Sequence, residues 1–262
     1  MIQKLRGNKG FTLIELMIAL VLTAVSAKVI YDVYLAQKKS SEINEELVGI
    51  QQNLRAALYY MEDEIKKAGL DPSRNANAGI QIADVSTIQL TSDFRGGEND
   101  SIDNNKDGTI DEFINGVDDD GDGLIDEADE QREWYDGDTG DPGENVTYSL
   151  YDSQSDGDLD LGRLSGGGFI QPVANNIDVL DFVYIDSAGT VLGPLPLDSN
   201  GRNNIRTVEI TLIARAEKMD MDYTDTQAYL NRQGNVILAA PNDHYRRMLM
   251  TTTVKVRNQG LN

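Results

Sequence analysis

Hydrophobic positions divide the first seventy residues into two helical parts. An apolar run from Phe11 to Ala27 contains one charged residue, Glu15, and is just long enough to cross a bilayer as a helix. Further on, apolar residues recur every three or four positions, as on one helical face: Ile43, Leu47, Ile50, Leu54, Ala57, Leu58, Met61, Ile65 and Ala68. We therefore predict one helix from Phe11 to Ala68, about 87 Å long, which ends at Gly69.

The remainder of the chain has strand-like patterns. Five runs are rich in Val, Ile, Thr and Tyr and are bounded by Gly, Asn, Asp or Pro: 80–90, 146–151, 176–185, 205–214 and 250–256. Ser187 to Thr190 is typical of a hairpin turn. The polar stretch 220–243 is expected to be a loop with a short helix around Thr226 to Asn231. Together the patterns predict an α+β fold, in which the amphipathic half of the long helix packs on an antiparallel sheet.

Charge is concentrated in one segment. Of the 262 residues, those from Asp93 to Asp160 include 24 acids and three bases, which accounts for the whole formal net charge of -21. Such a field repels nucleic acid and attracts cations. The chain has no cysteine, so disulfides do not stabilise it.

The acidic segment contains a loop with calcium-ligand spacing. Residues 118–129 place acids at positions 1, 3, 5, 9 and 12 of a twelve-residue loop, with Gly123 at position 6. This is the spacing with which an EF-hand loop supplies oxygens to Ca²⁺, including a backbone carbonyl at position 7. The predicted ligands are Asp118, Asp120, Asp122, the carbonyl of Leu124, Asp126 and Asp129. Since position 12 is Asp, the loop is more similar to dockerin or thrombospondin type 3 repeats.

A second loop precedes the first by fifteen residues. Its predicted ligands are Asp103, Asn105, Asp107, Thr109 and Asp111, while position 12 is Ile114 and supplies none. A third acidic group, around Gly157, has no acid at position 3 and is expected to be a polar turn. The alternative for the whole segment is a solvated acidic loop without metal.

The junction Gly10-Phe11 separates a short basic leader from the apolar run. Lys4, Arg6 and Lys9 precede it without any acid, which favours a cytoplasmic N-terminus. The stretch from Gly10 to Leu16 resembles the class III signal of type IV prepilins and type II secretion pseudopilins. The resemblance implies cleavage between Gly10 and Phe11, methylation of Phe11, and a contact of Glu15 with the N-terminal amine of a neighbouring subunit during assembly.

The strand motifs indicate one group within this family. The stretches 171–184, 205–215 and 252–258 are similar to those of PilW-like minor type IV pilins, which are related to J-type pseudopilins. The implied organisation is a leader (1–10), a transmembrane half of the helix (11–35), an amphipathic half (36–69) and a periplasmic head (70–262) that includes the acidic segment (93–160).

The resemblance also implies a function. We expect a minor pilin of a Gram-negative bacterium, made in the inner membrane, processed by prepilin peptidase and assembled with other pilins, with adhesion or partner binding near the pilus tip. Two alternatives stay open: a type II secretion pseudopilin, and a membrane-anchored calcium-dependent binding module that does not polymerise.

Motifs of enzymes are not found. The chain has no cysteine nucleophile, no Gly-x-Ser-x-Gly elbow and no phosphate-binding loop. Its one histidine, His244, lies in a polar stretch and is expected to be a surface or hydrogen-bonded structural residue. We therefore expect a protein without catalytic activity.

Overall fold

The computed structural model describes residues 10–72, 74, 76–94, 139–140, 143–153, 155, 157–166 and 168–258. The chain divides into two compact units, Met1–Val48 and Gly49–Asn262. The helix α1 (Leu13–Lys67) contributes to both units.

In the first unit the N-terminal part of α1 is apolar and exposed. It is the one helix, among the residues described, that is long and apolar enough to cross a membrane. Its large side chains from Leu13 to Leu35 are all exposed. A helix of this kind needs an apolar environment outside its own chain.

In the second unit α1 has one buried face. The buried residues are Ile50, Leu54, Ala57, Leu58, Met61 and Ile65, all members of the apolar stripe. The helix ends as the sequence indicates, because Gly69 has a left-handed φ of 78° and its N–H donates to the Thr91 carbonyl at 3.0 Å. The predicted helix is thus confirmed, with ends at Leu13 and Lys67.

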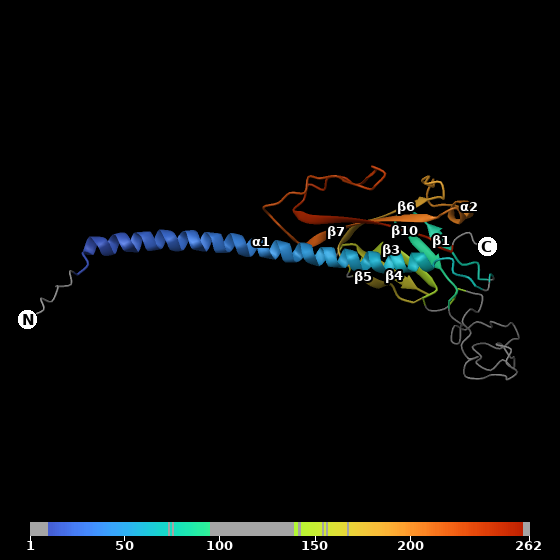
Figure 1. Cartoon of the computed structure of the whole chain (residues 1–262), viewed down its shortest axis with the longest axis horizontal. Helices are drawn as coiled ribbons and strands as arrows, with labels where there is room; N and C mark the ends of the chain where they lie inside the picture. Colours follow the sequence, from blue (N-terminus) through green and yellow to red (C-terminus); the bar gives the residue numbers. More distant parts are fainter. Residues whose placement is uncertain are drawn as a thin grey trace, which may run out of the picture. The chain divides into compact units, whose positions relative to one another are not determined.

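Two antiparallel sheets complete the second unit (Figure 1). The larger follows the order β1-β2-β3-β4-β5, formed by Ile80–Ala83, Ile88–Thr91, Asn145–Tyr151, Asp160–Ser165 and Gln171–Ala174. The smaller has the order β10-β7-β6, formed by Tyr245–Lys255, Thr207–Met219 and Ile177–Ile185. A short hairpin, β8 (Tyr229–Leu230) and β9 (Val236–Leu238), and the helix α2 (Ser199–Asn203) are the remaining elements.

The core lies between α1 and the inner faces of the sheets. Its fully buried side chains include Leu54, Met61, Tyr148, Phe182 and Ile210. Polar contacts add to this packing: the Thr252 hydroxyl on β10 donates to Glu62 on α1 at 2.6 Å, and this hydrogen bond lowers the pKa of Glu62. The α+β fold with a long helix packed on antiparallel sheets is as predicted.

Some elements differ from the prediction. The run 80–90 is two strands rather than one, because Asp84 turns the chain and its N–H donates to the Thr87 carbonyl at 2.9 Å. The strands β4 and β5 were not predicted, and β7 and β10 are longer than expected. The helix expected around Thr226 to Asn231 is wrong, since this part contains β8. The turn at Ser187 to Thr190 is confirmed: Asp186 N–H donates to the Thr190 carbonyl at 3.0 Å.

Candidate functional site

Thr12 and Glu15 cap the start of α1. The Thr12 N–H donates to Glu15 Oε2 at 2.8 Å, and the Glu15 N–H donates to Thr12 Oγ1 at 3.3 Å. This reciprocal pair is a capping box, which satisfies two of the N–H groups that a helix leaves open at its start. The Glu15 carboxylate is therefore held at the positive end of the helix by its own chain.

Gly10 and Phe11 lie just outside this cap. Neither belongs to the helix, and Phe11 is 93% exposed. A Cβ atom on Gly10 would meet no atom within 4 Å. Packing among the described residues therefore gives no reason for glycine at position 10.

Polar groups within the apolar run are satisfied locally. The Thr23 hydroxyl donates to the Ala19 carbonyl at 2.8 Å, which is the usual arrangement of a threonine inside a helix. Lys28 pairs with Asp32 at 2.7 Å just beyond the run. Glu15 is thus the only charge that a bilayer-spanning segment from Phe11 to Ala27 would carry.

The predicted calcium ligands lie outside the described residues. They are Asp103, Asn105, Asp107, Thr109, Asp111, Asp118, Asp120, Asp122, Leu124, Asp126 and Asp129. The interval that contains them connects β2 to β3, which are neighbours in the larger sheet. Within the part of the chain that the structure describes, no group of three or more acidic or histidine side chains is arranged to hold a metal.

Three acids around Gly157 belong to the described residues: Asp152, Asp158 and Asp160. Asp152 accepts from the Gly157 N–H at 3.0 Å, and Asp160 accepts from the Asn176 N–H at 2.9 Å. Asp158 pairs with Arg215 on β7. These contacts agree with the polar turn expected here.

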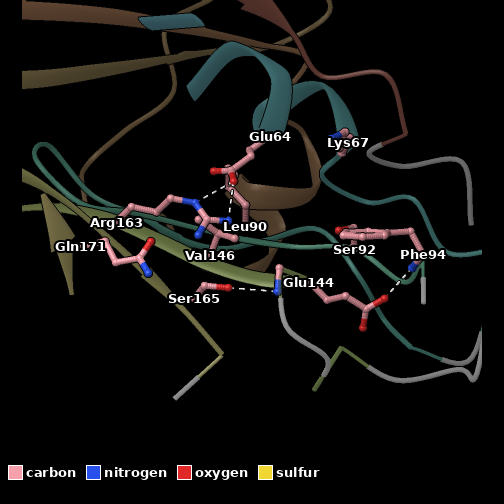
Figure 2. Close-up of a pocket in the computed structure, with 11 residues that line it drawn as sticks. Glu64, Lys67, Leu90, Ser92, Phe94, Glu144, Val146, Arg163, Ser165 and Gln171 are labelled. Carbon is pink, nitrogen blue, oxygen red and sulfur yellow. Dashed lines mark hydrogen bonds and ion pairs between the residues drawn. The ribbon is translucent and has the colours of Figure 1, made fainter. Parts of the chain in front are cut away.

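A cleft of about 560 Å³ lies between the end of α1 and the larger sheet (Figure 2). On one side Glu64 of α1 accepts from Arg163 Nε on β4 at 2.8 Å and from the Tyr148 hydroxyl on β3. Burial, and then the charge of Glu64, raises the pKa of Tyr148 far above its ordinary value. The tyrosine therefore stays a neutral donor, and the three side chains fasten the helix to the sheet.

Arg247 on β10 is the centre of an ion cluster that sequence reasoning missed. Its side chain is 4% exposed and contacts Asp178 at 2.6 Å, Asp225 at 3.2 Å and Asp243 at 2.7 Å. The hydrogen bonds from Arg247 lower the pKa of Asp243. Nearby, His244 Nδ1 lies 2.5 Å from the Tyr223 carbonyl oxygen, which is the structural role expected for this histidine.

Comparisons with known proteins match both ends of the chain. Residues 5–27 match the prokaryotic N-terminal methylation motif, and residues 168–258 match the family of type IV pilus-assembly protein W. Among solved structures, a type IV-like pilin from Thermus thermophilus aligns with 80% of this chain and 97% of its own length, at 14% identity and a TM-score of 0.44. No curated protein matches the sequence.

The N-terminal motif, the apolar helix and the antiparallel sheets define a membrane-anchored protein of the pilin type. Through residues 168–258 the chain is also similar to type IV pilus-assembly protein W, so both matches indicate a pilin-like protein. Pilins are structural subunits, which prepilin peptidase processes and which assemble with other pilins.

Proposed function

We propose that this protein is a minor subunit of a type IV pilus that takes part in pilus assembly. It is anchored in the inner membrane of a Gram-negative bacterium with its head in the periplasm, and it carries adhesion or partner binding near the pilus tip. The observation that carries the proposal is the capped segment Gly10–Glu15 in front of an apolar helix, on a chain that ends in a PilW domain.

Processing takes place at the Gly10–Phe11 bond. This position is exposed and lies outside the helix, so a peptidase reaches it without unwinding α1. Because a Cβ atom at position 10 would meet none of the described residues, we infer that the glycine serves the peptidase rather than the fold. Gly10→Leu should therefore insert normally and keep its leader, which mass spectrometry of the purified N-terminus detects. Cleavage at the wild-type rate would contradict this role.

Glu15 acts in assembly through its charge. A carboxylate in the bilayer costs about 3 kcal/mol on insertion scales and more by simulation. The capping box with Thr12 lowers this cost in an isolated subunit. On assembly the carboxylate exchanges this contact for the amine of Phe11 on a neighbouring subunit.

Two substitutions separate charge from capping. Glu15→Gln keeps a side chain that completes a capping box but removes the charge, whereas Glu15→Ala removes both. We expect both variants to be inserted and processed, and both to be lost from sheared filaments, as measured by immunoblot against membrane fractions. Normal incorporation of Glu15→Gln would show that capping alone suffices and would overturn the assembly role of the charge. Assays of piliation and of protein export in the same strains separate a pilus role from a type II secretion role.

We also propose that calcium stabilises the head through the loops 103–111 and 118–129. Support comes from the ligand spacing and from the place of the segment between two paired strands, where folding of the loops would tie down their ends. Without an ion, the crowded carboxylates repel one another.

Calorimetric titration of calcium into the soluble head, residues 36–262, tests this. We expect one or two sites and a higher melting temperature with calcium than with chelator. In the double variant Asp118→Asn, Asp122→Asn, the heat of calcium binding and the rise in melting temperature should both be lost. The control Asp136→Asn, which lies outside both loops, should keep both. Absence of heat and of any shift would make the segment a solvated acidic loop.

A further inference from the structure

The smaller sheet has a cleft of about 490 Å³ beside its edge strand β6. The hairpin β8–β9 lines it from one side, through Asn231, Gln233 and Val236, and the turn after β6 lines it from the other, through Val191 and Leu192. Asp181 of β6 also lines it. The cleft is remote in sequence from the processing segment, and it combines apolar walls with a few polar groups, as ligand sites do.

Strand register places Asp181 on the face of the sheet away from α1. Phe182 pairs with Ile210, which pairs with Thr252, the residue that contacts α1. Because side chains alternate along a strand, Asp181 and its partner Thr211 face the opposite way. The hairpin β8–β9 covers this face: Asn231 Nδ2 donates to Asp181 at 3.1 Å, and Gln233 donates to Glu209 at 2.7 Å.

Asp181 is buried without a cation. It is 6% exposed, and in the described part of the chain no Lys, Arg or His nitrogen forms an ion pair with it. Arg232, next to Asn231 in the hairpin, pairs with Glu209 at 3.2 Å and donates to Thr253. Burial raises the pKa of Asp181, the hydrogen bond from Asn231 opposes this rise, and the charge of Glu209 adds to it. A buried carboxylate beside a second acid is costly, and a cation supplied from outside would offset that cost.

We propose that this cleft binds a lysine or arginine side chain, flanked by apolar residues, on a segment of another protein. The carboxylate of Asp181 pairs with the cation, and the side-chain oxygen of Gln233 accepts from one of its remaining N–H groups. The apolar neighbours of the cation pack on Val191 and Val236, which are 51% and 59% exposed. These exposed apolar side chains favour a protein segment over a free amine, because a free amine would leave them in water. The site goes beyond the proposed function, since it needs no filament.

Peptide titration of the full chain in detergent micelles tests the proposal. The probes are acetyl-Val-Lys-Val-amide, its norleucine counterpart of similar shape without charge, and n-butylammonium. We expect the lysine peptide to give saturable NMR shifts at Val179–Tyr184 and Asn231–Ile237. The norleucine peptide should bind about tenfold more weakly because it lacks the charge-assisted contact. n-Butylammonium should also bind about tenfold more weakly, because it lacks the apolar contacts.

Matched variants make the assignment specific. Asp181→Asn keeps the shape and a hydrogen-bonding carbonyl for Asn231, and it should abolish the preference for lysine while its spectrum elsewhere stays unchanged. Glu217→Gln, an exposed acid on β7, should keep that preference. Equal binding of the lysine and norleucine peptides, a lysine preference that survives Asp181→Asn, or no saturable shift at the cleft would each overturn the proposal. Tighter binding of n-butylammonium than of the lysine peptide would overturn the choice of a protein segment.

Discussion

Glu64 shows how a single carboxylate can hold α1 to the larger sheet. Its Oε1 atom lies 2.6 Å from Arg163 (Figure 2). Its other oxygen accepts from the buried Tyr148 hydroxyl. The side chains of Arg163 and Glu64 are 22% and 18% exposed, so water screens the pair only in part. Removal of Glu64 would leave both a guanidinium and a buried hydroxyl without their acceptor.

We predict that Glu64→Ala lowers the free energy of unfolding by about 2 kcal/mol, the cost of leaving buried donors unsatisfied. Glu64→Gln should cost less, because the amide oxygen still accepts one hydrogen bond. The control Asp63→Ala removes an exposed ion pair with Lys67 and should change stability by less than about 0.5 kcal/mol. Urea unfolding of the head measures all three. Equal losses for Glu64→Ala and Asp63→Ala would contradict the role of the buried contacts.

Sequence reasoning at the residue scale reaches local patterns and misses long-range groups. The calcium spacings lie within twelve residues and remain a prediction. The capping box Thr12-x-x-Glu15 is also local, but our sequence analysis did not predict it. The Arg247 cluster joins residues from positions 178, 225, 243 and 247, and the cleft at Asp181 needs the hairpin around position 231. No local spacing indicates such groups, because only the folded topology brings them together.

At the scale of elements, strands depend more on their neighbours than α1 does. The helix was predicted because its apolar stripe repeats over many residues. The strand β4 contains Asp160, Gly162, Arg163 and Ser165 and has no strand pattern of its own; its conformation follows from pairing with β3 and β5. Likewise the hairpin β8–β9 is tied to the smaller sheet by side-chain hydrogen bonds to Asp181 and Glu209.

The segment between β7 and β10 depends on Arg247, and this gives a pH prediction. The pKa of Asp243 is lowered in the folded state, so its ionised form stabilises the fold above the ordinary value of about 3.9. That contribution is lost as the pH falls through the lowered pKa. The protection factors of the amides in Tyr229–Leu238, which correct the exchange rate for its intrinsic dependence on pH, should therefore be smaller below about pH 4 than at neutral pH.

Asp243→Asn serves as the comparison at each pH. At neutral pH the variant should exchange faster than the wild type, because the charged contact with Arg247 is absent. The difference should disappear as the pH falls through the lowered pKa of Asp243, since Asp243 then becomes protonated in the folded as well as the unfolded wild type. Asp181, whose pKa is raised, contributes the opposite trend to both proteins and therefore leaves the comparison intact. A difference that persists unchanged at low pH would contradict the prediction.

At the scale of the whole molecule, the boundary between the two units falls inside α1. The first unit ends at Val48 and the second begins at Gly49, which is the only glycine from Leu13 to Lys67. Glycine weakens a helix interior because it loses more backbone freedom on folding than other residues do. A Cβ atom at Gly49 would meet nothing within 4 Å, so no packing among the described residues requires a glycine there. Gly49 is therefore expected to weaken α1 locally at the boundary between the two units.

Gly49→Ala should stabilise α1 by about 0.5–1 kcal/mol and slow amide exchange over residues 45–53. The same substitution at Gly69 should have the opposite sign, a loss of about 1 kcal/mol, because its φ of 78° is left-handed and disfavours alanine. Exchange measured on both variants in micelles tests the pair, and faster exchange in Gly49→Ala would show that the glycine is needed for the fold. Incorporation of the Gly49→Ala subunit into filaments then tests whether the glycine acts in assembly. If the stabilised subunit is excluded from filaments, local opening of α1 at the unit boundary is a step of assembly. If it is incorporated normally, assembly does not need this opening.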